Sequence, residues 1–200
     1  MADIGEVRFE SRTTKVAVVL RDAAFKTIRE QALAAGGKET GGILIGRYDS
    51  SRDVAIVKEA TSRTRDSRSG WSWFERGASG LKDLLRTRWS RGDYYLGEWH
   101  SHPGAAPDPS GDDINNMRTI SRDRSYECPK PIMVIAGTTF QTVRLSVSVF
   151  EAGSLLLLQR VLEGAKAPTR TLSAQDARSI TTSVALAKDP TDPDDFHGVW

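Results

Sequence analysis

Two of the three histidines of this 200-residue chain, His100 and His102, are separated by a single residue. In an extended strand, side chains at positions i and i+2 point to the same face, so both imidazoles can reach one point in space. Asp113 follows eleven residues after His102, behind a proline-containing segment. Two neutral imidazoles, one carboxylate and a fourth position left to water form the ligand set of a catalytic zinc ion. The spacing therefore predicts a metal-dependent hydrolase.

Asp113 also fits a purely structural role. Ser110 and Asp113 have the spacing of a helix N-cap and the third helical position, where a carboxylate completes a capping box without any metal. The two roles are compatible, because a side chain in the first helical turn projects from a rigid base. Asp112 is the competing metal ligand, and the residues alone leave that choice open.

Glu39 follows the paired glycines Gly36 and Gly37 at the expected start of a strand. Its position alone fits an ordinary exposed charge in a loop. Hydrolysis of an amide also needs a base that is not a metal ligand, which takes a proton from water and passes it to the leaving amine. The residues around Glu39 favour this second role only through the family resemblance described below.

Cys128 is the single cysteine of the chain, which excludes an internal disulfide and indicates a reducing, cytoplasmic location. A cysteine-protease site would need a histidine of its own for this thiol. His197 is the one histidine left over, near the end of the chain. We therefore expect Cys128 to be a buried structural thiol.

The composition is that of an ordinary globular domain, with 38% hydrophobic and 27% charged residues. A net charge of +2 is too small to indicate nucleic-acid binding. No apolar run approaches the roughly 20 residues that span a bilayer. The first ten residues are charged and lack the apolar core of a signal peptide. We expect neither a nucleic-acid nor a membrane partner.

Apolar periodicity predicts a mixture of strands and helices. Strands are expected at residues 15–20, 40–48, 54–60, 94–100, 131–136 and 143–150. Helices are expected at residues 21–35, 80–89, 110–122 and 173–187. Residues 154–163 fit a strand or a short helix, residues 61–70 a polar loop, and residues 188–200 a mobile acidic tail with two prolines. The pattern predicts an α/β (α+β) fold in which helices flank a curved, mostly antiparallel sheet.

The motif residues together resemble one known family. His100-Ser101-His102, then seven residues, Ser110, two residues and Asp113, with an upstream Glu39 in Glu-Thr-Gly-Gly-Ile-Leu-Ile-Gly, is similar to the JAMM (MPN-plus) zinc metalloproteases. The resemblance covers about residues 15–150. It implies a cytidine-deaminase-like fold, with residues 1–165 as the JAMM domain and residues 166–200 as a C-terminal helix and tail.

The resemblance also implies roles for the motif residues. His100, His102 and Asp113 would hold one zinc ion, with water as the fourth ligand, and this favours Asp113 over Asp112. Glu39 would activate the attacking water, and the Ser110 hydroxyl would help to stabilise the tetrahedral oxyanion.

The activity implied is that of an isopeptidase or peptidase. It would cleave after the C-terminus of a ubiquitin-like protein, either to release it from a conjugate or to process its precursor. The short chain looks most like the compact bacterial members encoded beside E1- and E2-like enzymes in antiphage operons, either type II CBASS or bacterial ubiquitin-like conjugation systems. The sequence leaves open which modifier is cleaved, the oligomeric state and the purpose of the tail.

Three other functions compete with this one. The same site could serve a zinc hydrolase of small amino-acid or sulfur-carrier conjugates. A non-catalytic MPN interaction module would have lost motif residues, whereas all of them are present here. RadC-like proteins, which are linked to DNA, usually have asparagine where this chain has Ser101.

Trp71 and Trp73, with Phe74, form an aromatic segment before the second expected helix. Tryptophans are mostly buried, so we expect them to cover the edge of the core. The alternative is a groove that holds an extended peptide tail by strand addition. In the family, the segment at this place helps to bind the ubiquitin-like partner. The basic residues 63–68 are expected to be a solvated loop, with an acidic partner as the alternative.

Overall fold

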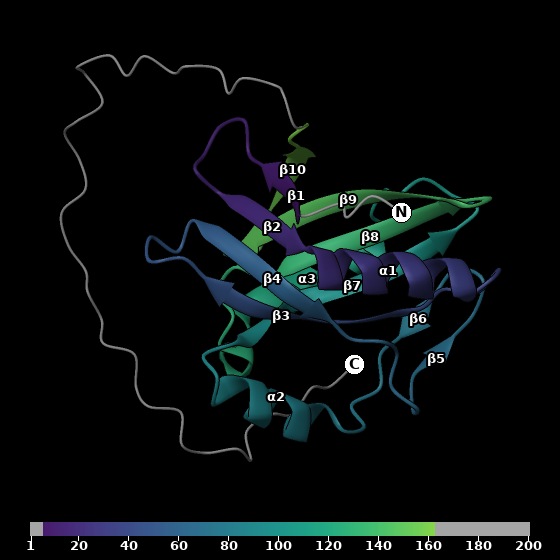
Figure 1. The fold of residues 1–200 in the computed structure, drawn as a ribbon, viewed down its shortest axis with the longest axis horizontal. Coiled ribbons are helices and arrows are strands. Elements are labelled where there is room, and N and C mark those ends of the chain that lie inside the picture. Colours follow the sequence, from purple (N-terminus) through teal and green to yellow (C-terminus); the bar gives the residue numbers. More distant parts are fainter. Residues whose placement is uncertain (1–5, 163–200) are drawn as a thin grey trace.

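The computed structural model describes residues 6–162 (Figure 1). It has the expected α/β fold, in which eight strands form one curved sheet with helices packed on it. The strand order is β1-β10-β9-β8-β7-β3-β4-β2, and β1 pairs with β2 as well as β10, so the sheet closes into a barrel. The expected curved, mostly antiparallel sheet is confirmed, since among the described barrel strands only β2–β4 and β7–β8 pair in parallel, whereas its closure was not predicted. The domain boundary at residue 165, the helix at 173–187 and the tail lie outside the described residues.

The elements follow one another closely along the chain. The strands are β1 (Glu6–Glu10), β2 (Ala17–Arg21), β3 (Gly41–Tyr48), β4 (Val54–Ala60), β5 (Arg68–Ser69), β6 (Phe74–Glu75), β7 (Tyr94–Pro103), β8 (Ile132–Thr139), β9 (Thr142–Glu151) and β10 (Ser154–Arg160). The helices are α1 (Asp22–Ala34), α2 (Leu81–Trp89), α3 (Gly111–Arg122) and the short 3-10 helix η1 (Arg124–Tyr126). Within residues 6–162, no helix combines the length and the apolar character needed to cross a membrane.

Three strands, β1, β5 and β6, were not expected from the sequence, and the type of a fourth element, β10, was left open. β1 was not among the expected strands, although the alternation of Val7 and Phe9 with charged residues is typical of a half-buried strand, and it closes the barrel. The leucine run of β10 is a strand, which settles the open choice between strand and helix. The expected loop at 61–70 contains β5, which pairs with β6 in a separate two-stranded sheet. That short hairpin has no apolar periodicity, so pattern reasoning could not find it.

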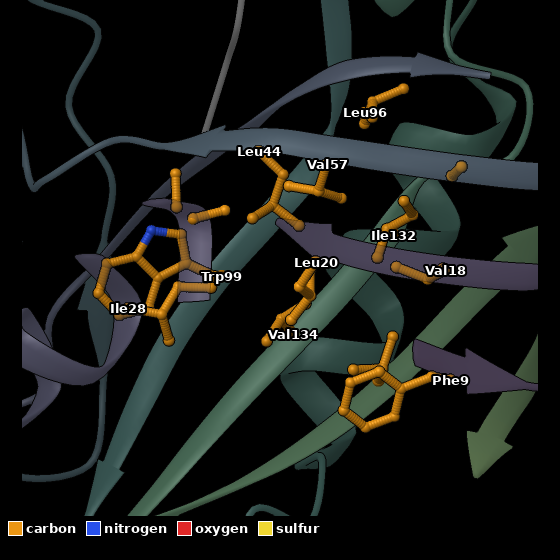
Figure 2. Close-up of a cluster of buried hydrophobic side chains, with 14 of the residues drawn as sticks. Phe9, Val18, Leu20, Ile28, Leu44, Val57, Leu96, Trp99, Ile132 and Val134 are labelled. Atoms are coloured by element: carbon orange, nitrogen blue, oxygen red, sulfur yellow. The ribbon is translucent and has the colours of Figure 1, made fainter. Parts of the chain in front are cut away.

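Two apolar clusters hold the fold together on the two faces of the sheet. The inner cluster fills the barrel and includes one face of α1 (Figure 2), with Ile28, Leu44, Trp99 and Val134 among its members. The outer cluster packs α2, α3 and η1 against the outside of β3, β7, β8 and β9. α3 is therefore fixed beside the outer face of β7, where it can share a site with that strand.

A bulge in β7 decides which of its side chains face α3. Leu44 is opposite Gly97, whereas Ile45 is opposite Tyr95, so Leu96 is an extra residue in the pairing with β3. Leu96 and Trp99 both point into the barrel as a result. A bulge of this kind re-aims every side chain beyond it. Gly97 permits it, because its φ is 140° and a Cβ there would lie 2.0 Å from the Ile132 carbonyl oxygen.

Candidate metal centre

β7 brings His100 and His102 to the outer face of the sheet. The strand runs through Pro103, three residues further than expected, so both histidines lie within it and Ser101 between them points inward. The two Nε2 atoms are 3.1 Å apart. The parallel pairing of β7 with β8 continues past both histidines, to Pro103 opposite Thr138. The two imidazoles are thus held by paired backbone on a rigid strand.

α3 supplies the third member, Asp113, from its first turn. Asp113 Oδ1 is 3.2 Å from His100 Nε2, and Oδ2 is 3.7 Å from His102 Nε2. The capping box with Ser110 is also present, since the Ser110 backbone N–H donates to Asp113 Oδ2 at 2.7 Å and the Ser110 hydroxyl accepts from the Asp113 backbone N–H at 3.1 Å. The Ser110 hydroxyl also donates to Asp113 Oδ2 at 2.6 Å. The two roles considered for Asp113 therefore coexist in one residue.

The geometry of His100, His102 and Asp113 fits a small metal ion. One ligand atom from each lies within 4.8 Å of the others. Zinc bonds of about 2.0–2.1 Å in tetrahedral geometry separate ligand atoms by roughly 3.4 Å. The distance between the two histidine Nε2 atoms, 3.1 Å, and the distance from His100 Nε2 to Asp113 Oδ1, 3.2 Å, are both close to that value. Asp112 lines the same cleft but is not part of this group.

The ionisation of these residues suits metal binding. Burial, reinforced by the neighbouring His100, lowers the pKa of His102, which favours the neutral imidazole that can coordinate. Burial works to raise the pKa of Asp113, but hydrogen bonds and charge from His100, together with hydrogen bonds from Ser110, hold that pKa well below its usual range. A neutral histidine and an ionised carboxylate are the protonation states that a divalent cation requires.

Glu39 lies beside the metal-ligand group, just before β3. Its side chain is 7% exposed and lines the cleft that also contains His100 and Asp113. Burial raises the pKa of Glu39 to about 7; the charge of His100 lowers it in part, and Asp113 raises it further. A carboxyl with a pKa near neutrality can both accept and donate a proton, as a general base and acid must.

Backbone contacts fix the position of Glu39 relative to the ligands. Ser101, between the two histidines, donates its N–H to the Thr40 carbonyl at 2.8 Å, and its Oγ accepts the Thr40 N–H at 3.1 Å. The Glu39 N–H donates to the Gly70 carbonyl at 2.9 Å. Sequence reasoning missed the role of Ser101, and no local signal points to it, because its partner is 61 residues away.

Aromatic residues form part of the wall of the cleft, which has a volume of about 540 Å³. Trp71 and Trp73 line it with exposed fractions of 77% and 49%, so the expectation that they cover the core edge is wrong. Each lies over a glycine, because a Cβ on Gly37 would meet the Trp71 ring and one on Gly70 the Trp73 ring. The alternative, a groove that holds an extended peptide tail, stays a prediction that their exposure allows.

A buried ion pair among the residues that line the cleft was not anticipated. Glu98 accepts a hydrogen bond from Arg76 Nε at 3.0 Å and another from the Tyr95 hydroxyl at 3.2 Å. Burial raises the pKa of Glu98, and the charge of Arg76 opposes that shift.

Cys128 is buried as expected, and its burial raises the thiol pKa to about 12. A thiol of that kind does not act as a nucleophile at neutral pH.

Comparison with known proteins agrees with this geometry. The family described as prokaryotic homologues of the JAB domain matches residues 21–148. The chain belongs to this family. A relative from Enterobacter hormaechei subsp. hoffmannii, named CD-NTase/cGAS isopeptidase, is 43% identical over 134 residues, which are 67% of this chain and 74% of the relative. The expected resemblance is thereby confirmed, and the protein is a metalloprotease of the JAB type.

Two further comparisons agree with this family assignment, one in sequence and one in fold. A probable metalloprotease of Sinorhizobium fredii, y4qB, is 35% identical over 104 residues, covering 48% of this JAB-domain chain and 61% of the relative. The solution structure of protein DSY2949 from Desulfitobacterium hafniense superposes with a TM-score of 0.52 at 18% identity, covering 69% of this chain and 87% of that one. The latter likeness concerns the fold alone.

Proposed function

We propose that this protein is a zinc-dependent isopeptidase that releases a protein modifier from its conjugates or processes its precursor. The observation that carries the proposal is the convergence of two imidazoles and a carboxylate in one cleft with a buried carboxyl that is not a member of the ligand group. A metal and a separate base are the two components that amide hydrolysis by activated water requires.

His100, His102 and Asp113 would hold the zinc ion. When bound, zinc acts as a Lewis acid that polarises a carbonyl and lowers the pKa of water to about 7. The roles left to the protein include keeping His102 neutral and Asp113 ionised. The lowered pKa values of these two residues support both.

Glu39 is the proposed proton carrier. Its carboxylate accepts a proton from the attacking water as the oxygen bonds to the scissile carbonyl carbon. It then delivers that proton to the leaving amine nitrogen as the C–N bond breaks. Its raised pKa makes the carboxyl a better base than an exposed glutamate, while burial keeps competing solvent away.

Ser110 is proposed to stabilise the oxyanion of the tetrahedral intermediate. In the structure its hydroxyl donates to Asp113 Oδ2. The same hydroxyl therefore has two possible acceptors, a metal ligand and the substrate oxygen, and it must turn from one to the other during the reaction.

The substrate is proposed to be a protein joined through its C-terminus to an amine. The sequence resemblance favours a ubiquitin-like modifier, and E1- and E2-like enzymes would form such a conjugate. The isopeptidase relative from Enterobacter is named for a CD-NTase, which favours a nucleotidyltransferase as the released protein. The exposed Trp71 and Trp73 beside the cleft support a polypeptide over a small molecule, because a small conjugate would need no surface of this kind.

Cleavage of a C-terminal fusion tests the proposal. A ubiquitin-like protein and a CD-NTase, each taken from the same operon as this protein and fused to a reporter, are incubated with the enzyme, with and without a zinc chelator. The proposal predicts chelator-sensitive cleavage after the last residue of one of them. Failure to cleave either fusion by enzyme that contains stoichiometric zinc would contradict it and favour a small conjugate as substrate.

A further inference from the structure

The Arg76–Glu98 ion pair joins the aromatic edge of the cleft to the strand that bears the metal ligands. Arg76 directly follows β6, and its side chain is only 4% exposed. Glu98 is in β7, two residues before His100, and its side chain is 15% exposed. Both line the cleft. A buried charge pair is costly to form, and removing one partner leaves the other charge buried and uncompensated.

The small β5–β6 sheet depends on a few such contacts for its position. It pairs with none of the barrel strands among the described residues, since its two strands bond only to each other. An isolated two-stranded hairpin has little stability of its own in water. Its placement must therefore come from side-chain and turn contacts with the barrel.

Two of those contacts involve residues that line the cleft. The Gly70 carbonyl, just after β5, accepts the Glu39 N–H at 2.9 Å. Arg76, just after β6, donates to Glu98 of β7 at 3.0 Å. The residues between these two contacts, 71–75, include the exposed tryptophans. The hairpin thus spans the distance between the base and the ligand strand.

We infer that Arg76 and Glu98 are positioning residues, which set the aromatic edge of residues 71–75 against His100 and Glu39 so that a substrate chain is held beside the metal ligands. The inference rests on the proposed isopeptidase function. Neither residue is a catalytic residue in this account, because each acts through the hairpin. The segment placed by the pair contacts the polypeptide substrate, so the pair determines how tightly that substrate binds.

The test compares steady-state kinetics of Arg76→Gln with those of Arg88→Gln. Arg88 makes two hydrogen bonds to Glu59 at 2.7 and 3.2 Å and does not line the cleft, so it controls for the loss of an ion pair. We expect Arg76→Gln to raise KM for the protein conjugate by about tenfold, with a smaller effect on kcat and unchanged metal content. Arg76→Lys, which keeps the charge, should recover part of the loss, and Arg88→Gln should leave KM unchanged.

Hydrogen exchange supplies a readout that does not depend on turnover. If the pair positions the hairpin, the Glu39 amide that donates to Gly70 should exchange faster in Arg76→Gln and in the milder Glu98→Gln, but not in Arg88→Gln. An unchanged KM, an unchanged exchange rate of Glu39, or loss of the metal in Arg76→Gln would each overturn the inference. Failure of the wild-type enzyme to cleave any conjugate would instead contradict the proposed function, and the exchange measurement would still decide the inference.

Discussion

Ser101 Oγ accepts the backbone N–H of Thr40 at 3.1 Å, and this bond ties the strand of the metal ligands to the residue next to Glu39. Ser101 is fully buried. Its position between His100 and His102 makes it part of the metal motif in sequence, yet its side chain faces away from the metal site. Ser101 therefore ties the proposed ligands His100 and His102 to the proposed base Glu39 through its bonds to Thr40.

Replacing Ser101 by alanine tests that relationship. The Thr40 N–H would lose its partner in a buried place, which costs about 1–3 kcal/mol in the free energy of unfolding. We expect kcat to fall while zinc stoichiometry stays at its wild-type value, as measured by metal analysis beside steady-state kinetics. Ser121→Ala, which loses one hydrogen bond to the Arg118 carbonyl on α3, is the control. Loss of zinc with unchanged kcat per bound metal would contradict the assignment.

Asp113→Ala and Asp112→Ala form a matched pair on the first turn of α3. Asp113 is within 3.2 Å of His100 Nε2, whereas Asp112 is not in the ligand group. We expect Asp113→Ala to lose most of its zinc affinity and Asp112→Ala to keep it. Competition with a chromophoric chelator measures both. Loss of zinc affinity in Asp112→Ala, with affinity kept in Asp113→Ala, would mean that Asp112 is the ligand.

Ser110→Ala separates helix capping from metal binding. Loss of the N-cap should lower the free energy of unfolding by about 1 kcal/mol in the presence of chelator. Because the hydroxyl also donates to Asp113 Oδ2 at 2.6 Å, zinc affinity should fall as well. Ser110→Thr, which keeps a hydroxyl, should recover both. Wild-type zinc affinity in the alanine variant would show that the hydroxyl does not orient the ligand.

The raised pKa of Glu39 predicts a pH dependence of stability in the metal-free protein. The folded state retains the Glu39 proton up to pH about 7, whereas the unfolded chain releases it near 4.5. The folded state therefore binds more protons between these values, and stability falls as the pH rises through that window. Denaturant titrations at pH 5 and 8 should show a smaller loss for Glu39→Gln than for wild type. Equal losses would show that Glu39 is not held in a desolvated site.

The local parts of the site could be predicted from the sequence, and the non-local parts could not. Side chains at positions i and i+2 lie on the same face of any extended strand. The convergence of His100 and His102 could therefore be predicted from their spacing alone. The bulge at Leu96 could not be anticipated, since it exists only in the pairing of β7 with β3. The Arg76–Glu98 pair likewise depends on where a hairpin without apolar periodicity packs.

Burial of the aromatic segment was misjudged for a related reason. Tryptophan is mostly buried on average, and nothing local to Trp71 indicates otherwise. The structure leaves it 77% exposed, in the turn of a β5–β6 hairpin that forms a sheet separate from the barrel. The exposure of a large side chain depends on the tertiary structure around it. Here the exposed Trp71 lines the cleft.

The most direct test of the account is the zinc content and turnover of Glu39→Gln, measured on the same preparation. If His100, His102 and Asp113 bind zinc and Glu39 transfers the proton, Glu39→Gln should keep the wild-type zinc stoichiometry. Its cleavage of the conjugate should fall by at least about 100-fold. Loss of zinc with the substitution would make Glu39 a ligand, and undiminished cleavage would mean that another group carries the proton. Either result would contradict the account.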